Sequence, residues 1–223
     1  MKVITQDIAA GTAHQPVIDL TADGKTANCY IATLSSQAYS FDATVAGNGV
    51  ITDGLLQAVQ KFEGRTLSAS LSGGEARLLW QSNPYLIEPG SISYAGGRIG
   101  FSLSGRPVSL GGNAVIGLFD ASGNCIWSWH IWSQNYDPAA TAQTYTSGAV
   151  FMDRNLGALE TDYTQPASRG LYYQWGRKDP FPYPALATNA YIPAPTVYAA
   201  GFEYAESDPR NSGTESPYDV MTL

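Results

Sequence analysis

The chain has 223 residues, only 14% of them charged, with a formal net charge of −7 and a pI near 4.7. Nucleic acids and anionic membrane surfaces are recognised by clustered Lys and Arg, so an acidic chain is a poor partner for either. The sequence contains no run of about 18 apolar residues that could span a bilayer. We therefore expect no nucleic-acid partner and no membrane insertion.

The first residues, Met1-Lys-Val-Ile-Thr-Gln-Asp7, do not continue into the apolar stretch and small-residue cleavage site of a signal peptide. Either no leader exists or it has been removed. A mature surface or secreted protein would begin in this way, and so would a phage structural protein. Residues 1–25 are expected to form a polar lead-in that ends at the turn Ala22-Asp-Gly-Lys25.

The composition favours strands and turns over helices. The 23 glycines and 14 tyrosines are typical of short strands joined by tight turns. Helical spacing of apolar residues is found only weakly, in the segment Asp53–Phe62. The sequence therefore predicts a mainly β protein.

Eight short runs have the composition of strands and follow one another at regular spacing. They are Asn28–Leu34, Tyr39–Ala46, Thr66–Leu71, Ala76–Gln81, Ser91–Tyr94, Arg98–Leu103, Ala114–Asp120 and Cys125–Trp132. The segments Ala95–Gly97 and Asp120–Asn124 predict hairpin turns, because Gly and Asn tolerate a positive φ. Over residues 1–136 we predict an antiparallel β-sandwich.

The last predicted strand is apolar on both of its faces. One face would hold Cys125, Trp127, Trp129 and Ile131, and the other Ile126, Ser128, His130 and Trp132. Such a strand belongs at the centre of a sheet or beneath a second module. The tryptophans could stack on sugar rings, but core packing is the stronger interpretation because exposed indoles are costly. His130 is expected to be structural, since no nucleophile or carboxylate is adjacent in sequence.

Cys29 and Cys125 are the only cysteines, and both lie in apolar, strand-like runs. They could form one disulfide, or they could be two buried thiols that behave as small hydrophobic groups, which is the favoured interpretation. No metal-ligand spacing is present, because His14 and His130 are isolated. We therefore expect no metal ion and no cofactor.

A change of composition predicts a second module after residue 136. The segment Ser133–Ser147 is polar and small, which indicates a linker with a boundary near residue 140. Residues 179–223 hold seven of the thirteen prolines and are expected to form long loops or a tail. The second module would cover residues 145–223.

Five charged residues stand in apolar surroundings within this second module: Asp153, Arg154, Arg177, Lys178 and Asp179. Opposite charges of this kind tend to pair, so a structural network of Asp153, Arg154, Arg177 and Asp179 is expected. A glycoside hydrolase would need two carboxyl groups about 5–10 Å apart. The acids Asp153, Glu160, Asp162 and Asp179 show no spacing that singles out such a pair, so we do not expect an enzyme.

Two long motifs carry a family resemblance. The segments Met152-Asp-Arg-Asn-Leu-Gly-Ala158 and Gly170-Leu-Tyr-Tyr-Gln-Trp-Gly-Arg-Lys-Asp-Pro-Phe181 resemble the Fibrobacter succinogenes major paralogous domain. That domain occurs in surface and exported proteins of Bacteroidetes-type bacteria. Upstream, Thr26–Ile31, Gly112–Ile116 and Trp127–Trp132 are similar to the β-sandwich module that precedes it, including in fimbrial-tip-like proteins.

The resemblance implies a fold and a class of function. After the sandwich it implies a partial C-type-lectin-like α+β module with long loops, in an extracytoplasmic or secreted protein. The family continues into a Cys-Pro-Pro-Gly-Trp-Arg-like stretch, which is missing before Leu223, so the module looks truncated or reduced. The paired catalytic cysteines of the related sulfatase-modifying enzymes are also missing, so that activity is not implied.

The predicted function is non-catalytic adhesion to a glycan or protein ligand. Tyrosine supplies contact area and a hydroxyl group at small entropic cost. The candidate ligand-binding residues are Tyr172, Tyr173, Trp175, Tyr183, Tyr191 and Tyr198. Lectin-like folds often bind calcium, although no calcium loop is legible in this sequence. The alternative is a structural subunit of a pilus or phage particle that self-assembles by strand donation.

Overall fold

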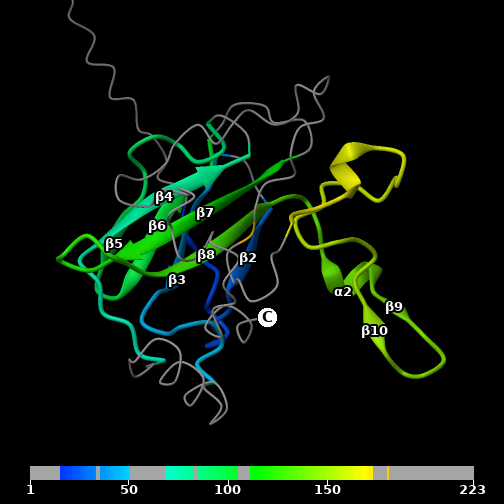
Figure 1. Ribbon diagram of the computed structural model, residues 1–223, viewed down its shortest axis with the longest axis horizontal. Coiled ribbons are helices and arrows are strands. Elements are labelled where there is room, and N and C mark those ends of the chain that lie inside the picture. Colours follow the sequence, from blue (N-terminus) through cyan, green and yellow to red (C-terminus); the bar gives the residue numbers. More distant parts are fainter. Residues whose placement is uncertain are drawn as a thin grey trace, which may run out of the picture.

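The computed structural model describes residues 16–33, 36–50, 69–82, 85–104, 111–172 and 180. The described part contains two four-stranded sheets and one two-stranded sheet, with a single short α-helix and one 3-10 turn (Figure 1). The prediction of a mainly β protein is confirmed. The helix expected at Asp53–Phe62 lies outside the described residues, as does the first half of the strand expected at Thr66–Leu71.

The first sheet has the strand order β1-β3-β6-β5. Its strands are β1 (Ile18–Asp19), β3 (Ala38–Asp42), β6 (Arg98–Ser102) and β5 (Ser93–Ala95). Strands β5 and β6 form the predicted hairpin, whose turn residues Gly96 and Gly97 have φ of 58° and 78°. The lead-in prediction missed β1, which is only two residues long.

The second sheet has the order β2-β8-β7-β4. Its strands are β2 (Cys29–Ala32), β8 (Cys125–Ser133), β7 (Gly112–Phe119) and β4 (Glu75–Gln81). The predicted β7–β8 hairpin is closed by Asp120, whose Oδ1 accepts hydrogen bonds from the backbone N–H groups of Ser122 and Asn124 at 2.9 and 2.8 Å. Strand β7 is thus one neighbour of β8 in this sheet, and β2 is the other.

Both sheets are mixed, so the expectation of purely antiparallel sheets is wrong. Strand β1 runs parallel to β3, and β2 runs parallel to β8. Strand β1 belongs to the first sheet and β2 to the second, so these consecutive strands do not form a hairpin with each other. Each strand instead pairs in parallel at the edge of its own sheet. Pairing of Cys29 with His130 joins residues 101 positions apart in the sequence, which no local pattern reveals.

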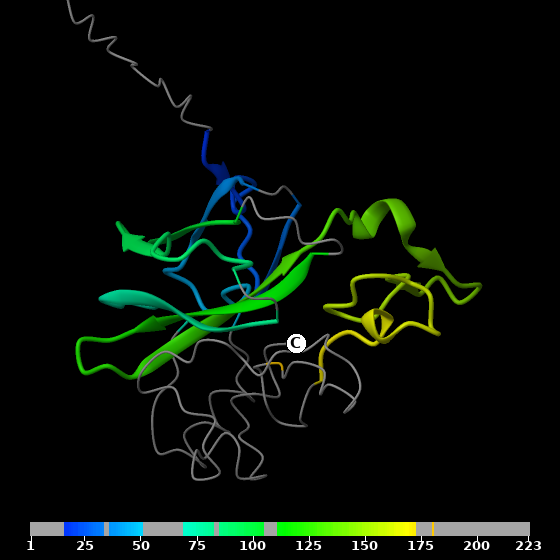
Figure 2. The same cartoon turned by 90° about the horizontal axis from the view of Figure 1, so that it is seen from above.

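The two four-stranded sheets lie in two layers (Figures 1 and 2). Buried apolar side chains from both sheets form one core. Tyr39, Phe41 and Phe101 project into it from the first sheet, and Ile116 and Trp129 from the second. The Phe41 and Trp129 rings lie 5.3 Å apart, so this aromatic contact joins the layers directly. Interlocked aromatic side chains supply much of the buried apolar area of such a core.

Strand β8 is buried on both faces, as predicted for a central strand. Trp127, Trp129 and Ile131 belong to the core between the sheets, whereas Trp132 lies on the opposite face in a separate cluster. The sugar-stacking interpretation of these tryptophans is wrong, because all three are almost fully buried. An irregularity in the β7–β8 register also places Cys125 on the outer face, opposite to the prediction.

The outer face of the second sheet is covered by the segment that follows β8. Leu156, Leu159 and Ala167 pack there against Trp132 and Tyr136. The segment Ser133–Ser147, expected to be a linker, instead contains α2 (Pro138–Thr141) and β9 (Gln143–Thr144). Strand β9 forms a hairpin with β10 (Val150–Phe151), which follows this segment. A 3-10 turn, Pro166–Ser168, follows. No helix among the described residues is long and apolar enough to cross a membrane.

The two cysteines are free, so the disulfide alternative is wrong. Cys29 pairs with His130 across the β2–β8 ladder, and Cys125 lies five residues earlier on β8. At about 3.3 Å per residue along a strand, the two thiols are too far apart for a bridge, which requires Cα atoms within about 7 Å. Both side chains are partly rather than fully buried.

The Trp129→Ala substitution tests whether the contact between the sheets dominates stability. Trp129 is fully buried, so the cavity should lower the free energy of unfolding by about 3–5 kcal/mol. Urea denaturation followed by circular dichroism measures this change. Tyr163→Ala is the control, because Tyr163 is 87% exposed and its loss should cost less than about 0.5 kcal/mol. Equal effects of the two changes would contradict this account of the core.

Candidate functional site

A polar chain of three side chains crosses the outer face of the second sheet. Cys29 on β2, His130 on β8 and Asn113 on β7 lie on three neighbouring strands. The Cys29 Sγ is 3.1 Å from His130 Nδ1, and His130 Nε2 is 2.8 Å from Asn113 Oδ1. His130 and Asn113 are both buried, and burial raises the pKa of the Cys29 thiol to about 12.

Asn113 also connects this chain of side chains to the covering segment. Its Nδ2 donates a hydrogen bond of 2.9 Å to the carbonyl oxygen of Gly157. Gly157 has a φ of 80°, and a Cβ atom there would lie 2.5 Å from the Leu171 side chain. The loop at residue 157 therefore requires glycine both for its backbone conformation and for the close approach of Leu171.

A second polar group fixes the base of the β9–β10 hairpin. The Arg154 guanidinium donates hydrogen bonds to both Asp153 oxygens, at 2.8 and 3.1 Å, and to Gln134 Oε1 at 3.3 Å. It also lies 4.0 Å above the Tyr136 ring, an arrangement typical of a cation–π contact. These hydrogen bonds from Arg154 hold the pKa of the Asp153 carboxyl below its usual value despite partial burial. The described half of the predicted charge network is therefore an ion pair.

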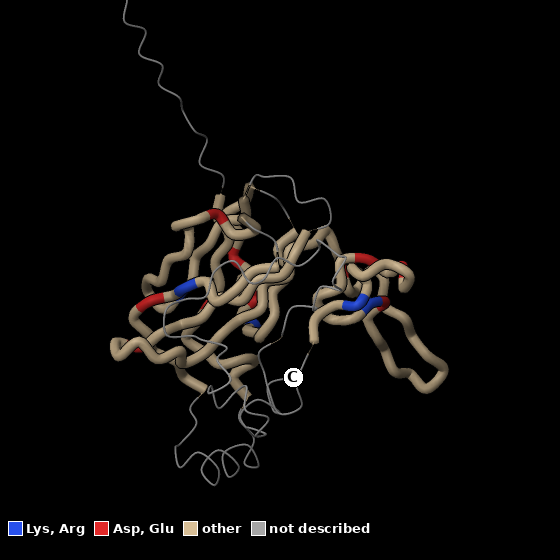
Figure 3. Tube along the Cα trace, turned by 45° about the horizontal axis from the view of Figure 1, so that its top comes forward, with Lys and Arg blue, Asp and Glu red and all other residues tan. Residues whose placement is uncertain are grey.

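The hairpin above this base exposes apolar side chains. Tyr145, Val150 and Phe151 are 59%, 63% and 58% exposed, and the Tyr145 and Phe151 rings meet edge to face at 5.4 Å. The hairpin stands away from the two large sheets (Figures 1 and 2), and residues 138–152 contain no charged side chain (Figure 3). An exposed apolar surface without charges is typical of a binding site.

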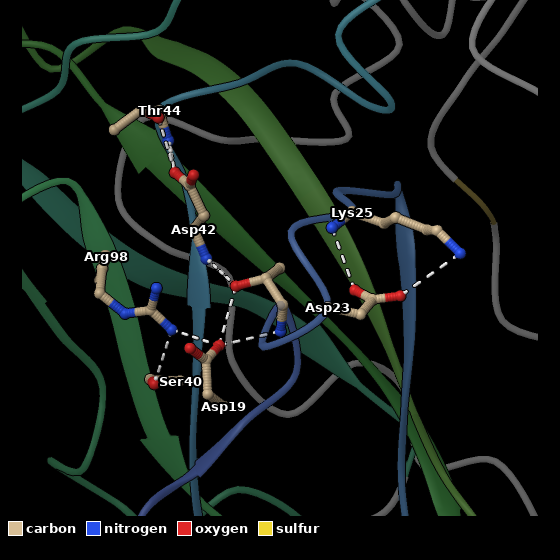
Figure 4. Close-up of polar contacts among 8 residues, drawn as sticks. Asp19, Asp23, Lys25, Ser40, Asp42, Thr44 and Arg98 are labelled. Atoms are coloured by element: carbon tan, nitrogen blue, oxygen red, sulfur yellow. Dashed lines mark hydrogen bonds and ion pairs between the residues drawn. The ribbon is translucent and has the colours of Figure 1, made fainter.

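The acidic residues on the first sheet do not form a comparable site. Asp19 accepts hydrogen bonds from the backbone and hydroxyl of Thr21 and from Arg98, and Asp42 accepts two from Thr44 (Figure 4). Burial raises the pKa of Asp19, but these hydrogen bonds outweigh it and leave the pKa below its usual value. Within the described residues, no group of three or more His, Cys, Asp or Glu side chains is placed to hold a metal ion.

The predicted ligand-binding residues are only partly within the described structure. Tyr172 is 46% exposed and therefore accessible. Tyr173, Trp175, Tyr183, Tyr191 and Tyr198 lie outside the described residues, as do Arg177, Lys178 and Asp179 of the predicted charge network. The hairpin was missed, because its Ala- and Thr-rich composition was interpreted as a linker. The alternation of Tyr145 with small residues before Gly148 was the signal that could have indicated it.

Two of the carboxyl groups considered for a glycoside hydrolase, those of Asp153 and Asp162, have a lowered pKa. A general acid in such an enzyme needs a raised pKa. Hydrogen bonds from Thr164 lower the pKa of Asp162, and those from Arg154 lower the pKa of Asp153. Neither carboxyl group has the property that this reaction requires of its acid.

We expect Asn113→Ala to loosen the covering segment. The change removes the partner of the buried His130 Nε2 and of the Gly157 carbonyl, and should lower the free energy of unfolding by about 2–4 kcal/mol. Limited proteolysis should also cut residues 153–171 faster. Asn135→Ala changes an exposed residue and should have little effect on either measurement. Unchanged protease resistance in the Asn113 variant would show that this hydrogen-bond chain does not hold the segment.

Arg154→Met should remove a contribution to stability that depends on pH. Because the folded pKa of Asp153 lies below its unfolded value of about 3.9, the ion pair stabilises the protein above that pH and loses its effect as pH falls through the folded pKa. At pH 7 we expect a loss of about 1–2 kcal/mol in the free energy of unfolding.

Chemical denaturation from about pH 2 to pH 7 tests this prediction, and the difference between wild type and variant should shrink at the acidic end. Lys25→Met is the matched control, because its ion pair with Asp23 is exposed and should contribute less than about 1 kcal/mol. A difference for Arg154→Met that stays constant with pH would assign the effect to packing alone.

Comparison with known proteins identified no relative of the chain. No family model, no curated protein and no solved structure matches the chain. The resemblance to the Fibrobacter succinogenes major paralogous domain therefore remains a prediction that depends on the two motifs.

Proposed function

We propose that the chain is a non-catalytic binding protein of a bacterial surface that contacts a glycan or protein ligand through the β9–β10 hairpin. The observation that carries this proposal is the exposure of Tyr145, Val150 and Phe151 together on an uncharged hairpin. The extracytoplasmic location and the family follow from the motifs at residues 152–158 and 170–181 and are part of the same proposal.

The base of the hairpin is well suited to presenting these side chains. Asp137 caps α2 by accepting a hydrogen bond from the Ala139 N–H at 2.9 Å, which fixes the chain before the hairpin. The Asp153–Arg154 pair fixes it afterwards, against Tyr136. A binding surface that is ordered in advance loses less conformational entropy when the ligand binds.

The exposed residues themselves suit a mixed surface. Tyr145 and Phe151 offer ring faces and edges that can pack on a sugar ring or on an apolar side chain. Val150 and the partly exposed Met152 add aliphatic area, which favours a protein ligand. Tyr172, also exposed, lies elsewhere on the covering segment and is a second candidate contact.

A second candidate function, a subunit of a pilus or particle, is favoured by the unprotected strand edges. Strand β1 pairs with β3 through only two residues, at the edge of the first sheet. Within the described residues, β9 and β10 pair only with each other, and they carry none of the edge charges that usually prevent pairing with another chain. A strand from a neighbour could therefore extend either sheet.

The double substitution Tyr145→Ser, Phe151→Ser tests the binding function. A glycan array, screened with and without calcium, identifies a bound glycan for the unaltered chain. The double variant should then bind it at least about tenfold more weakly, since each aromatic anchor is worth 1 kcal/mol or more. Tyr163→Ser is the control, because Tyr163 is exposed outside the hairpin. Glycan binding that survives the double substitution would contradict the role of the hairpin.

Sedimentation distinguishes the second candidate. If no glycan is bound and the mass of the chain rises with concentration, the assembly function is supported. In that case Phe151→Lys should return the chain to a monomer, because a charge on the edge of β10 opposes strand addition.

A further inference from the structure

The chain Cys29–His130–Asn113 has a fixed direction of proton donation. The Gly157 carbonyl can only accept, so the Asn113 Nδ2 donates to it and Oδ1 faces His130. Oδ1 can only accept, so Nε2 of His130 carries a proton. In the neutral imidazole His130 Nδ1 is then a lone-pair acceptor, 3.1 Å from the Cys29 sulfur, and it accepts the hydrogen bond of the thiol.

This direction of donation is the one that activates a thiol. A histidine that accepts the thiol proton on one nitrogen, and is oriented by an amide oxygen on the other, is the arrangement of Cys-His-Asn nucleophilic groups. Proton transfer to Nδ1 would produce a thiolate beside an imidazolium that Asn113 Oδ1 stabilises. Asn113 is here a positioning residue, because it acts on the thiol only through His130.

Cys125 provides a contrast within the same sheet. Its thiol donates to the backbone carbonyl oxygen of Trp127, at 3.3 Å. A carbonyl oxygen accepts a hydrogen bond but cannot take up the proton at neutral pH. Neither cysteine forms a disulfide, and both are partly buried. Cys125 interacts electrostatically with Arg77, whereas Cys29 has an imidazole nitrogen within hydrogen-bond distance, so a partner that can take up the thiol proton distinguishes Cys29.

We propose that Cys29 is a reactive site for small neutral disulfides, with His130 as the base that takes the thiol proton. The Cys29 sulfur attacks one sulfur of the disulfide, so a new S–S bond forms as the original S–S bond breaks. The proton held by His130 passes to the departing thiolate, which leaves as a thiol. Cys29 remains as a mixed disulfide, and no external oxidant or reductant is consumed.

The surroundings favour this class of electrophile. Cys29 packs at the border of the apolar cluster that contains Trp132, Tyr136 and Leu159. These residues are buried and Cys29 is only partly buried, so a neutral, apolar disulfide can reach the thiol beside them without leaving a charge unsolvated. Burial raises the thiol pKa to about 12, which opposes formation of the thiolate at neutral pH, so the reaction depends on transfer of the thiol proton to His130.

The experiment uses the full reduced chain and 4,4′-dithiodipyridine as the probe, with release of the pyridinethione followed by absorbance. Cys125→Ser leaves Cys29 alone, and Cys29→Ser leaves Cys125 as the matched control. We expect Cys29 to react at least about tenfold faster than Cys125 at pH 7, and His130→Gln in the Cys125→Ser chain to slow it by about 100-fold.

The pH dependence of the Cys29 reaction rate distinguishes a base that activates the thiol from a histidine that only packs against it. With His130 present, the Cys29 rate should reach a plateau as pH rises, because the imidazole takes up the thiol proton within the site. In His130→Gln the rate should instead rise about tenfold per pH unit, as for a thiol that must ionise alone.

Two results would overturn the proposal. One is a Cys29 rate no faster than that of Cys125, and the other is a Cys29 rate without a plateau in the Cys125→Ser chain. The second measurement needs no change at His130, so it remains decisive even if His130→Gln does not fold. Neither result depends on the hairpin, so the proposed binding function is tested separately.

Discussion

Burial of β8 on both faces is the constraint on which the rest of the structure depends. Trp127, Trp129 and Ile131 face the core between the sheets, while His130 and Trp132 lie beneath the covering segment. A shift of one residue in the register of β8 would exchange these two sets of side chains. The strand is therefore held in one register by two independent layers of packing, and the positions of β2, β7 and the segment after Ser133 follow from it.

The proposed binding hairpin depends on the outer of these two layers. Trp132 packs against Tyr136 at 5.1 Å, and Tyr136 in turn supports the Arg154 guanidinium. The Tyr136 ring therefore connects the aromatic packing on the sheet with the Asp153–Arg154 ion pair at the base of the hairpin. The side chains of Tyr145, Val150 and Phe151 are exposed to solvent, whereas the base of the hairpin packs on the outer face of the second sheet.

The outer layer also contains polar atoms that need partners. A buried histidine or asparagine without a hydrogen-bond partner costs about 1–3 kcal/mol, so the link from His130 through Asn113 to Gly157 joins stability to the docking of the covering segment. The same link orients His130 toward Cys29. One set of hydrogen bonds therefore serves two purposes: it holds the segment in place, and it places a base beside a thiol.

Most of the strands could be predicted from local sequence. Alternating apolar residues and Gly-containing turns located seven of the eight expected strands within the described residues, because side-chain alternation and turn chemistry are local properties. Strand β1 was too short to show alternation, and the β9–β10 hairpin was hidden by residues that are also common in linkers. The candidate site was predicted only in part: the exposure of Tyr172 and the Asp153–Arg154 pair agree with expectation, while the hairpin was not foreseen.

Local sequence was enough to predict the strand content, the burial of Cys125–Ser133 on both faces and the positions of the tight turns, because each depends on residues close together in the chain. The parallel pairing of β2 with β8, and with it the contact of Cys29 with His130, depends instead on the folded arrangement of the whole chain. Parallel pairing between distant strands depends on which edge remains free after the hairpins have formed, and on which layer the chain enters next. The packing of the whole molecule determines both the free edge and the layer.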